Sequence, residues 1–292
     1  MYELVKITEN AYYVDCPAKM GLVRISGNEV ILIDSGNDKD AGKRALRIIN
    51  ENGMILKSVY NTHSHADHIG GNRLIKERSG CDIYAPRGEM AFVENPLFEP
   101  SLLFGANPPA SLRHKFLMAE PSVAKPISEN SLPDGIGLIS LPGHSPDMTG
   151  FITSEGVAYI GDALSSVETL DKYGIGYLWD VGEYLKSLDR LKEIDAEIFV
   201  PSHAPVCKNI TELADYNLKS TLGVADRICE FISEPSCFDS LLCRVFSEFG
   251  LSMNFVQHAL IGSTVRAYLT YLTENGRAEA FVENNTLLWR RI

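Results

Sequence analysis

The residues with the clearest chemical potential lie in one short stretch, Thr62–His68, whose sequence is THSHADH. This stretch contains three of the chain's seven histidines and one aspartate. Imidazole nitrogens and carboxylate oxygens are ligands that zinc and other transition metals prefer. When such side chains are crowded onto one loop, their lone pairs and charges repel one another unless a cation binds between them. The stretch therefore predicts a metal site.

One pattern occurs four times along the chain: an apolar strand is followed by a turn and then by a metal-type side chain. The side chains that follow these four strands are His63, His144, Asp162 and His203. If the strand ends meet along one edge of a sandwich, these residues converge on one cleft together with His65, Asp67 and His68. A catalytic zinc uses three protein ligands and a water. Seven ligands therefore predict two metal ions that share one carboxylate.

These motifs make the chain similar to the metallo-β-lactamase superfamily. The similarity rests on four motifs that occur in the family's order: Thr62–His68, Pro142–Ser145, Gly161–Asp162 and Ser202–His203. It covers roughly the first 207 residues.

The resemblance assigns a role to each candidate ligand. It implies that His63, His65 and His144 hold one metal, that Asp67, His68 and His203 hold the other, and that Asp162 bridges the two. A further run, Ile31–Gly36, resembles the family's early strand motif. It implies that Asp34 supports the site without ligating a metal, although stabilising the local turn is an equally good role.

Two metal ions predict a hydrolase that needs no side-chain nucleophile. Two divalent ions, zinc first and manganese or iron as alternatives, lower the pKa of a bridging water so that hydroxide exists near neutral pH. One ion also polarises the substrate's oxygen. Asp67 is the carboxylate nearest the expected hydroxide. We expect Asp67 to be catalytic, by orienting the hydroxide and carrying its proton to the leaving group.

The elements that must position these residues alternate between strands and helices. The expected elements are strands within 3–34, 58–61, 137–160 and 197–200, and helices over 41–51, 69–78 and 181–194. Hydrophobic periodicity distinguishes the two types, and Gly27-Asn28 marks a tight turn between strands. Two strand-rich halves, each with helices, predict an α/β fold over residues 1–207, a four-layer α/β/β/α sandwich like that of the metallo-β-lactamases.

Beyond residue 207 the pattern becomes almost entirely helical. The expected elements are helices over 211–232, 240–249, 254–260 and 264–273, and a hairpin of strands 278–282 and 287–290. Short helices followed by a hairpin predict a small, helical, winged-helix-like domain over residues 208–292. This part carries eight Lys and Arg against ten Asp and Glu, and its expected recognition helix contains only Arg266 as a cation. Forming a homodimer or closing the active-site cleft therefore suits it better than gripping nucleic acid.

The substrate must be inferred from the pocket walls, because the fold alone does not choose it. Segment 86–126 is rich in Pro and aromatic residues, which favours an ordered lid or pocket wall. Candidate substrate-binding residues are Phe104 in this segment and Tyr173, Tyr177 and Trp179 after Asp162, although packing against the sandwich explains these aromatics equally well. An apolar wall favours a small ester, thioester or lactone over a bare phosphate.

Two other functions are compatible with the ligand pattern. A metal-dependent nuclease or phosphodiesterase, acting on RNA or DNA, would use the same site, since several members of the superfamily cut phosphodiesters. A mononuclear iron dioxygenase is the second alternative. Diiron relatives carry Glu where this chain has His65, whereas the single-iron dioxygenase branch keeps His there.

Composition restricts the partners and the location. The formal net charge of −11 disfavours tight, nonspecific binding of polyanions, so we expect a small-molecule substrate rather than nucleic acid. The first residues contain early charges and no long apolar core, so we expect neither a signal peptide nor a membrane anchor. The six cysteines form no Cys-x-x-Cys motif, which argues against a thiolate zinc site. We therefore expect a cytoplasmic protein.

Overall fold

Two β-sheets form the centre of the structure, a computed structural model that describes residues 2–292. The first sheet has seven strands in chain order: β1 (Glu3–Lys6), β2 (Ala11–Asp15), β3 (Met20–Ser26), β4 (Glu29–Ile33), β5 (Ile55–Tyr60), β6 (Asp82–Ala85) and β7 (Lys125–Pro126). Strands β1 to β4 pair antiparallel, as a meander joined by tight turns, and β4 to β7 pair parallel.

The second sheet has four strands in the order β11-β10-β9-β8. Their bounds are β8 (Ile136–Ser140), β9 (Thr149–Thr153), β10 (Val157–Gly161) and β11 (Ile198–Pro201). Strand β10 lies in the middle, parallel to β11 and antiparallel to β9. All five of its residues are buried, which explains its continuous apolar sequence.

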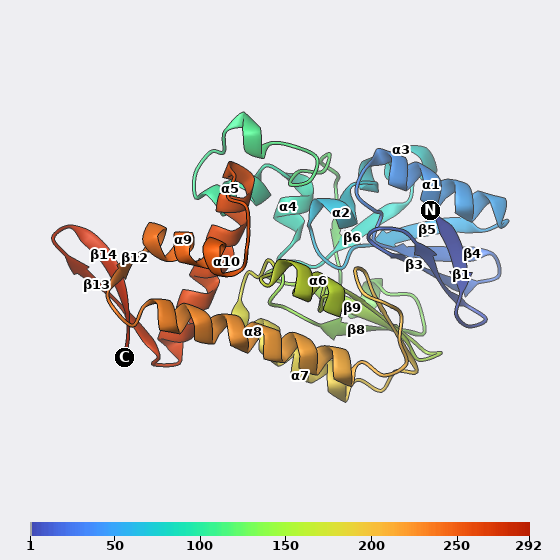
Figure 1. Cartoon of the computed structure of the whole chain (residues 1–292). Helices are drawn as coiled ribbons and strands as arrows, with labels where there is room; N and C mark the ends of the chain where they lie inside the picture. Colours follow the sequence, from blue (N-terminus) through green and yellow to red (C-terminus); the bar gives the residue numbers. More distant parts are fainter. Residues whose placement is uncertain (1) are drawn as a thin grey trace.

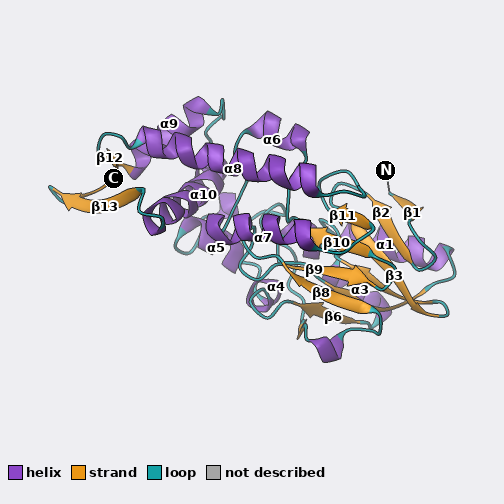
Figure 2. Cartoon of the chain, turned by 90° about the horizontal axis from the view of Figure 1, so that it is seen from below, coloured by secondary structure: helices purple, strands orange, loops and turns teal. Residues whose placement is uncertain are grey.

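Helices cover the outer faces of the two sheets (Figure 1, Figure 2). They are α1 (Lys39–Glu51) and α3 (Asn72–Ser79) on the first sheet and α7 (Val181–Glu193) on the second. In α1, Ala45 and Ile49 are buried at helical spacing and share a core with Val59 of β5. Between the sheets, Tyr60 packs edge to face on Phe151 with 5.9 Å between ring centroids. The predicted four-layer α/β/β/α sandwich is confirmed.

The proline-rich segment contains more regular structure than its sequence suggests. It forms α4 (Met90–Glu94), α5 (Phe98–Phe104) and the 3₁₀ turn η1 (Ala110–Leu112) before β7. Pro100 falls in the first turn of α5, where its missing N–H costs no helical hydrogen bond. Another helix that the pattern does not indicate, α6 (Val167–Tyr173), is capped by the side chain of Ser166.

The C-terminal part consists of three helices and a small sheet, which can be followed in Figure 2. Its elements are α8 (Thr211–Phe231), β12 (Ser236–Cys237), α9 (Phe238–Glu248), α10 (Phe255–Glu274), β13 (Ala278–Glu283) and β14 (Thr286–Arg291). Strand β14 lies between β12 and β13. Ile228 of α8 and Val265 of α10 belong to the same core as Leu188 of α7, so this part packs directly against the sandwich. The domain boundary after residue 207 and the winged-helix likeness stay predictions.

The expected pair of helices over 254–260 and 264–273 is wrong, because α10 runs through both segments as one helix. Gly262 lies in its middle, where one glycine costs only about 1 kcal/mol relative to alanine. Burial of Ile261 and Val265 on either side outweighs that cost. Among residues 2–292, none of the helices combines the length and the apolar character needed to cross a membrane.

Candidate metal centre

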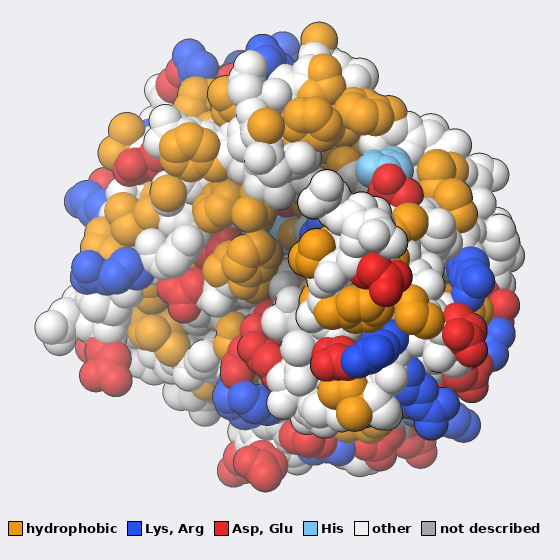
Figure 3. All heavy atoms as spheres, turned by 90° about the vertical axis from the view of Figure 1, so that its left-hand side faces the viewer, with side chains coloured by type: hydrophobic (Ala, Val, Ile, Leu, Met, Phe, Trp, Pro, Cys, Tyr) orange, Lys and Arg blue, Asp and Glu red, His pale blue; other side chains and the backbone are white. Residues whose placement is uncertain are grey.

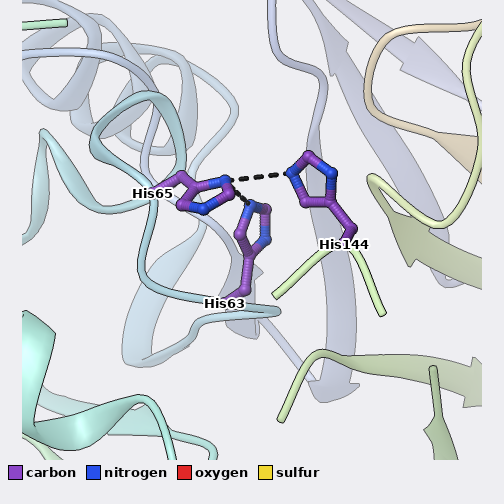
Figure 4. A group of neighbouring side chains, drawn as sticks. All are labelled: His63, His65 and His144. Atoms are coloured by element: carbon purple, nitrogen blue, oxygen red, sulfur yellow. Dashed lines mark hydrogen bonds between the residues drawn. The ribbon is translucent and has the colours of Figure 1, made fainter. Parts of the chain in front are cut away.

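Three histidines from two loops form the first candidate metal-binding group (Figure 4). His63 follows β5, His65 immediately precedes the short helix α2 (Ala66–Ile69), and His144 follows β8. Nδ1 of His65 lies 3.1 Å from Nε2 of His63 and 3.0 Å from Nε2 of His144. Three imidazole nitrogens that point at one spot are the ligand set of a catalytic zinc.

The turn that presents His144 depends on a glycine. Gly143 has a φ of +126°, and a Cβ atom at this position would lie 2.3 Å from the backbone nitrogen of Tyr184. Its carbonyl accepts hydrogen bonds from the backbone N–H groups of Trp179 and Asp180, at 2.9 Å each. The sequence Pro-Gly-His therefore packs the turn tightly against the start of α7.

The second candidate group contains two carboxylates and two histidines. Asp67 and His68 lie on α2, Asp162 follows β10, and His203 follows β11. Nε2 of His203 lies 3.0 Å from Oδ2 of Asp67, and Nε2 of His68 lies 3.3 Å from Oδ1 of Asp162. The other oxygen of Asp162 lies 3.5 Å from Nε2 of His144. Asp162 therefore touches both groups, and the structure brings together all seven side chains proposed as ligands.

Two buried polar atoms at this point test whether a metal fits. Within the described residues, Nε2 of His68 and Oδ1 of Asp162 are buried and have no hydrogen-bond partner. Buried polar atoms in native proteins are almost always satisfied, so such a pair needs an explanation. A divalent cation bound between the imidazole of His68 and the carboxylate of Asp162 would explain both atoms, because it would accept the lone pair of each. The donor sets, three nitrogens in one group and two nitrogens with two carboxylates in the other, fit two such ions.

The electrostatics of the first group and of the two carboxylates favour the protonation states that bind metal. Burial lowers the pKa of His63 well below its usual range and that of His65 to about 3, which keeps both imidazoles neutral. Burial opposes ionisation of Asp67 and Asp162, but the imidazoles of His68 and neighbouring histidines hold the pKa of each carboxyl below its usual range. Burial opposes protonation of His68, but the carboxylates around it, Asp162 foremost, hold its pKa well above the usual range, and Asp162 also raises the pKa of His203. Neutral imidazoles and ionised carboxylates are the forms that ligate, so a metal ion that binds the second group displaces protons from these two imidazoles.

Asp34 connects a histidine of each group through hydrogen bonds on the side of the rings opposite the candidate metal sites. Its carboxylate accepts hydrogen bonds from the backbone N–H and the hydroxyl of Thr62, both at 2.8 Å, and lies 2.9 Å from Nδ1 of His68. The Thr62 hydroxyl in turn lies 3.0 Å from Nδ1 of His63. Asp34 has a left-handed φ of 62°, an uncommon conformation for a residue with a side chain. These contacts aim the Nε2 atoms of both histidines at the centre.

Replacing Asp34 with asparagine is expected to weaken metal binding by about 10- to 100-fold, the usual effect of losing the carboxylate that orients a ligating histidine. Asparagine tolerates the left-handed backbone, so the fold should persist. Competition with a chromophoric chelator measures the affinity. Asp38→Asn is the matched control, because Asp38 caps α1 and pairs with Lys115 without contacting a candidate ligand, and asparagine caps equally well. Unchanged affinity in Asp34→Asn would contradict this role.

Glu89 links the two loops of the first group and was not indicated by the sequence. It is fully buried, and one carboxylate oxygen accepts hydrogen bonds from the backbone N–H and the hydroxyl of Ser64. The other oxygen accepts from the hydroxyl of Ser145 at 2.7 Å and from the backbone N–H of Asp147 at 2.9 Å. Ser64 lies between His63 and His65, and Ser145 follows His144. The carboxylate of Glu89 thus fixes the two loops that carry the three histidines relative to each other.

Glu99 is a second acidic residue that the sequence did not indicate. It lies on α5, and its Oε1 atom is 3.6 Å from Nε2 of His65. Burial raises the pKa of the Glu99 carboxyl to about 8. Neither Glu89 nor Glu99 belongs to a recognisable motif. The sequence indicates a role for them only through their position in segment 86–126, which is expected to form a lid or a pocket wall.

A cavity of about 220 Å³ opens onto the centre. Its lining consists of His65, Ala66, Asp67, Glu99, Phe116, Leu117, His144, Asp162, Tyr177 and Leu260. A smaller cavity of about 70 Å³ lies beyond Tyr177, beneath α6, α8 and α10. Both cavities touch His144 and Asp162, so ligands from both groups are accessible to a bound molecule.

The four residues proposed to bind substrate occupy different places. Tyr177 borders both cavities, with its ring centroid 5.4 Å from that of His65. In the described part of the chain, the other three do not line either cavity. Phe104 packs on Phe255 of α10, Tyr173 lies under the ammonium group of Lys172, and the backbone of Trp179 bonds to the His144 turn.

Comparison with known proteins places this arrangement in a family. The sequence profile of the metallo-β-lactamase superfamily matches residues 13–203. Hydroxyacylglutathione hydrolase GloC of Haemophilus influenzae is 29% identical over 56% of this chain and 71% of its own length. Hydroxyacylglutathione hydrolase of Thiobacillus denitrificans is 27% identical over 54% of this chain, which spans about half (49%) of that relative.

Solved structures agree on the fold over a longer part of the chain. A metallo-β-lactamase family protein of Thermus thermophilus superposes with a TM-score of 0.72 at 19% identity, covering 100% of this chain and 98% of its own. A β-lactamase domain protein of Burkholderia ambifaria gives a TM-score of 0.69 at 15% identity, covering 99% of this chain and 94% of its own. At this identity the likeness shows the fold alone, and it includes the C-terminal part.

Proposed function

Because the chain belongs to the metallo-β-lactamase superfamily and is a hydrolase, we propose that it holds two metal ions and cleaves a small carbon ester or thioester. The observation that supports this most directly is the pair of ligand groups that meet at Asp162 beneath one cavity. Several relatives are named hydroxyacylglutathione hydrolases, enzymes of thioesters, which favours a thioester among the carbon esters. The apolar part of the cavity wall also suits such a substrate better than a phosphodiester.

The two metal ions, which we take to be zinc from the nitrogen-rich donor sets, would lower the pKa of a bound water and polarise the scissile carbonyl. His63, His65 and His144 would hold one ion, and Asp67, His68 and His203 the other, with Asp162 shared between them. The three histidines of the first group are already gathered for this role, because Nδ1 of His65 lies within 3.1 Å of the Nε2 atoms of both His63 and His144.

Asp67 is the residue best placed to handle the proton. Its side chain is 43% exposed and lines the cavity, whereas the other carboxylate, Asp162, is 13% exposed. In hydrolysis, the water oxygen bonds to the carbonyl carbon, the bond from that carbon to sulfur or oxygen breaks, and the leaving atom takes up a proton. We assign to Asp67 the transfer of that proton from the water to the leaving group.

Metal analysis and a substrate panel test this function together. We expect two zinc ions per chain, turnover of esters or thioesters, a loss of about 100-fold or more after chelation, and recovery when zinc is added back. Exposed Glu94→Gln serves as a control variant that should behave like the unmodified chain. One iron per chain with oxygen consumption would overturn the proposal in favour of a dioxygenase. Cleavage of RNA or DNA without ester turnover would overturn it in favour of a nuclease.

A further inference from the structure

The two ring nitrogens of His65 face different neighbours. Nδ1 lies 3.1 Å from Nε2 of His63 and 3.0 Å from Nε2 of His144, so it points to the spot where the three imidazoles meet (Figure 4). Nε2 lies 3.6 Å from Oε1 of Glu99. A neutral imidazole carries its one proton on one of its two nitrogens. If Nδ1 offers its lone pair to a metal ion, the proton must reside on Nε2, the nitrogen that faces Glu99.

Glu99 is well placed to accept that proton in a hydrogen bond. The side chains of Glu99 and His65 are only 11% and 15% exposed, so water competes little for the contact. Hydrogen bonds from N–H to oxygen are about 2.7–3.2 Å long, and contacts at active sites commonly tighten to this range when a ligand binds. A carboxyl keeps an accepting oxygen whether it is ionised or protonated, so the raised pKa of Glu99 does not remove this partner.

Glu99 belongs to α5, a helix whose position depends on α10. With seven residues, α5 is too short to be stable by itself, so packing against its neighbours must hold it. The two helices lie side by side (Figure 1). Leu103 of α5 is buried in one cluster with Ala259 of α10, and the ring centroids of Phe104 and Phe255 are 5.9 Å apart. The C-terminal part therefore supports the helix that carries Glu99.

Helix α10 also supports a second neighbour of His65. The ring centroid of Tyr177 lies 5.4 Å from that of His65. The backbone N–H of Leu178 donates to the hydroxyl of Thr264 on α10 at 3.3 Å. Leu260 of α10 packs against the same apolar cluster as Tyr177. Two segments that contact His65 are thus fixed by one helix.

We propose that the C-terminal part is a component of the metal centre, in which α10 holds α5 in place and the Glu99 carboxyl fixes the ring orientation and the tautomer of His65. Glu99 is a positioning residue, because it acts on the metal ion through His65. This inference rests on the proposed function in one respect, namely that the group of His63, His65 and His144 binds a metal ion. It assigns to the C-terminal part a role within its own chain.

Replacing Glu99 with leucine tests the contact directly. Leucine has a similar size but accepts no hydrogen bond, so the ion of the first group should bind about 10- to 100-fold more weakly. Glu99→Gln keeps an accepting oxygen and should recover most of that affinity. Competition with a chromophoric chelator measures both ions, and the ion of the second group should bind equally well in all variants. Glu94→Leu, at an exposed position of α4, is the matched control.

Nuclear magnetic resonance distinguishes positioning of His65 from general packing. In the zinc-loaded protein, long-range ¹H–¹⁵N spectra should show His65 with its proton on Nε2 and with that proton protected from exchange with water. The protection should be lost in Glu99→Leu and kept in Glu99→Gln.

A change on α10, away from the centre, tests the support of α5. On the side of the molecule where α5, α9 and α10 lie, hydrophobic side chains gather at the surface (Figure 3). Phe104 and Phe255 are 43% and 44% exposed, so Phe255→Ala weakens the contact between the helices without opening the core. Loss of an aromatic pair changes an equilibrium constant by about two- to tenfold, and we expect the first ion to bind more weakly by this factor. Val282→Ala, which removes a 70% exposed apolar side chain from β13, is the matched control.

The double variant and the separate outcomes decide between the parts of the proposal. Phe255→Ala should add little further loss in the Glu99→Leu protein, because both changes act through the same carboxyl. If the unmodified chain binds no metal ion, the proposed function itself fails. If the unmodified chain binds two ions and Glu99→Leu binds both as tightly, Glu99 does not position His65. If Glu99→Leu weakens the first ion but Phe255→Ala does not, α10 does not hold Glu99 in place.

Discussion

Replacing Asp162 with alanine is expected to lower kcat/KM by about a thousandfold or more, the largest effect of any single substitution in this chain. Asp162 lies within 3.5 Å of candidate ligands of both groups. Its oxygens lie 3.3 Å from Nε2 of His68, 3.4 Å from that of His203 and 3.5 Å from that of His144. Removing them leaves three imidazoles without the shared carboxylate and separates the two groups.

Metal content distinguishes this loss from a general loss of structure. We expect the Asp162→Ala protein to retain fewer than two ions per chain after dialysis, with its circular dichroism unchanged. Asp195→Ala is the matched control, because Asp195 is exposed in the loop before β11. Two tightly bound ions in Asp162→Ala, at full occupancy, would show that Asp162 does not bridge.

Replacing Glu89 with glutamine is expected to weaken the first group selectively and to reduce stability. Glutamine has nearly the same shape, but its NH₂ group cannot accept from Ser145 and Asp147 or from Ser64. Each buried donor left unsatisfied costs about 1–3 kcal/mol. We therefore expect the free energy of unfolding to fall by about that amount or more. The ion held by His63, His65 and His144 should bind about 10- to 100-fold more weakly.

Urea unfolding and metal titration on the same preparation measure both effects. The second group does not contact Glu89 directly, so one ion per chain should still bind tightly. Glu94→Gln, at the end of the same helix α4 but exposed, is the matched control and should change neither quantity. The role assigned to Glu89 is refuted if Glu89→Gln keeps both ions and its full stability.

The candidate ligands could be predicted from the sequence because each belongs to a short motif or directly follows a strand. His63, His65, Asp67 and His68 occupy one loop and one helical turn, and His144, Asp162 and His203 each follow an apolar strand. Parallel strands in a sandwich bring their carboxyl ends together, so a ligand after each strand converges without further information.

Sequence reasoning failed where a residue acts through a partner distant in the chain. Glu89 acquires its role from Ser64 and from Ser145, 56 positions away along the chain, and a lone glutamate in a proline-rich segment carries no sign of either. The same holds for secondary structure: α10 continues through Gly262 because its neighbours are buried against α8 and α9, which local propensity does not record.

The sequence by itself determined the sandwich and the set of metal-type side chains, since both depend on short-range patterns: strand periodicity, turns, and ligands placed just after strands. Only the tertiary structure decided what surrounds those side chains. Leu260 reaches the cavity because α10 packs on α5 and η1, whereas Phe104, Tyr173 and Trp179 are not part of the lining of either cavity. Composition suggested an aromatic wall, but which side chains form it depends on how separate segments pack, and that packing is nonlocal.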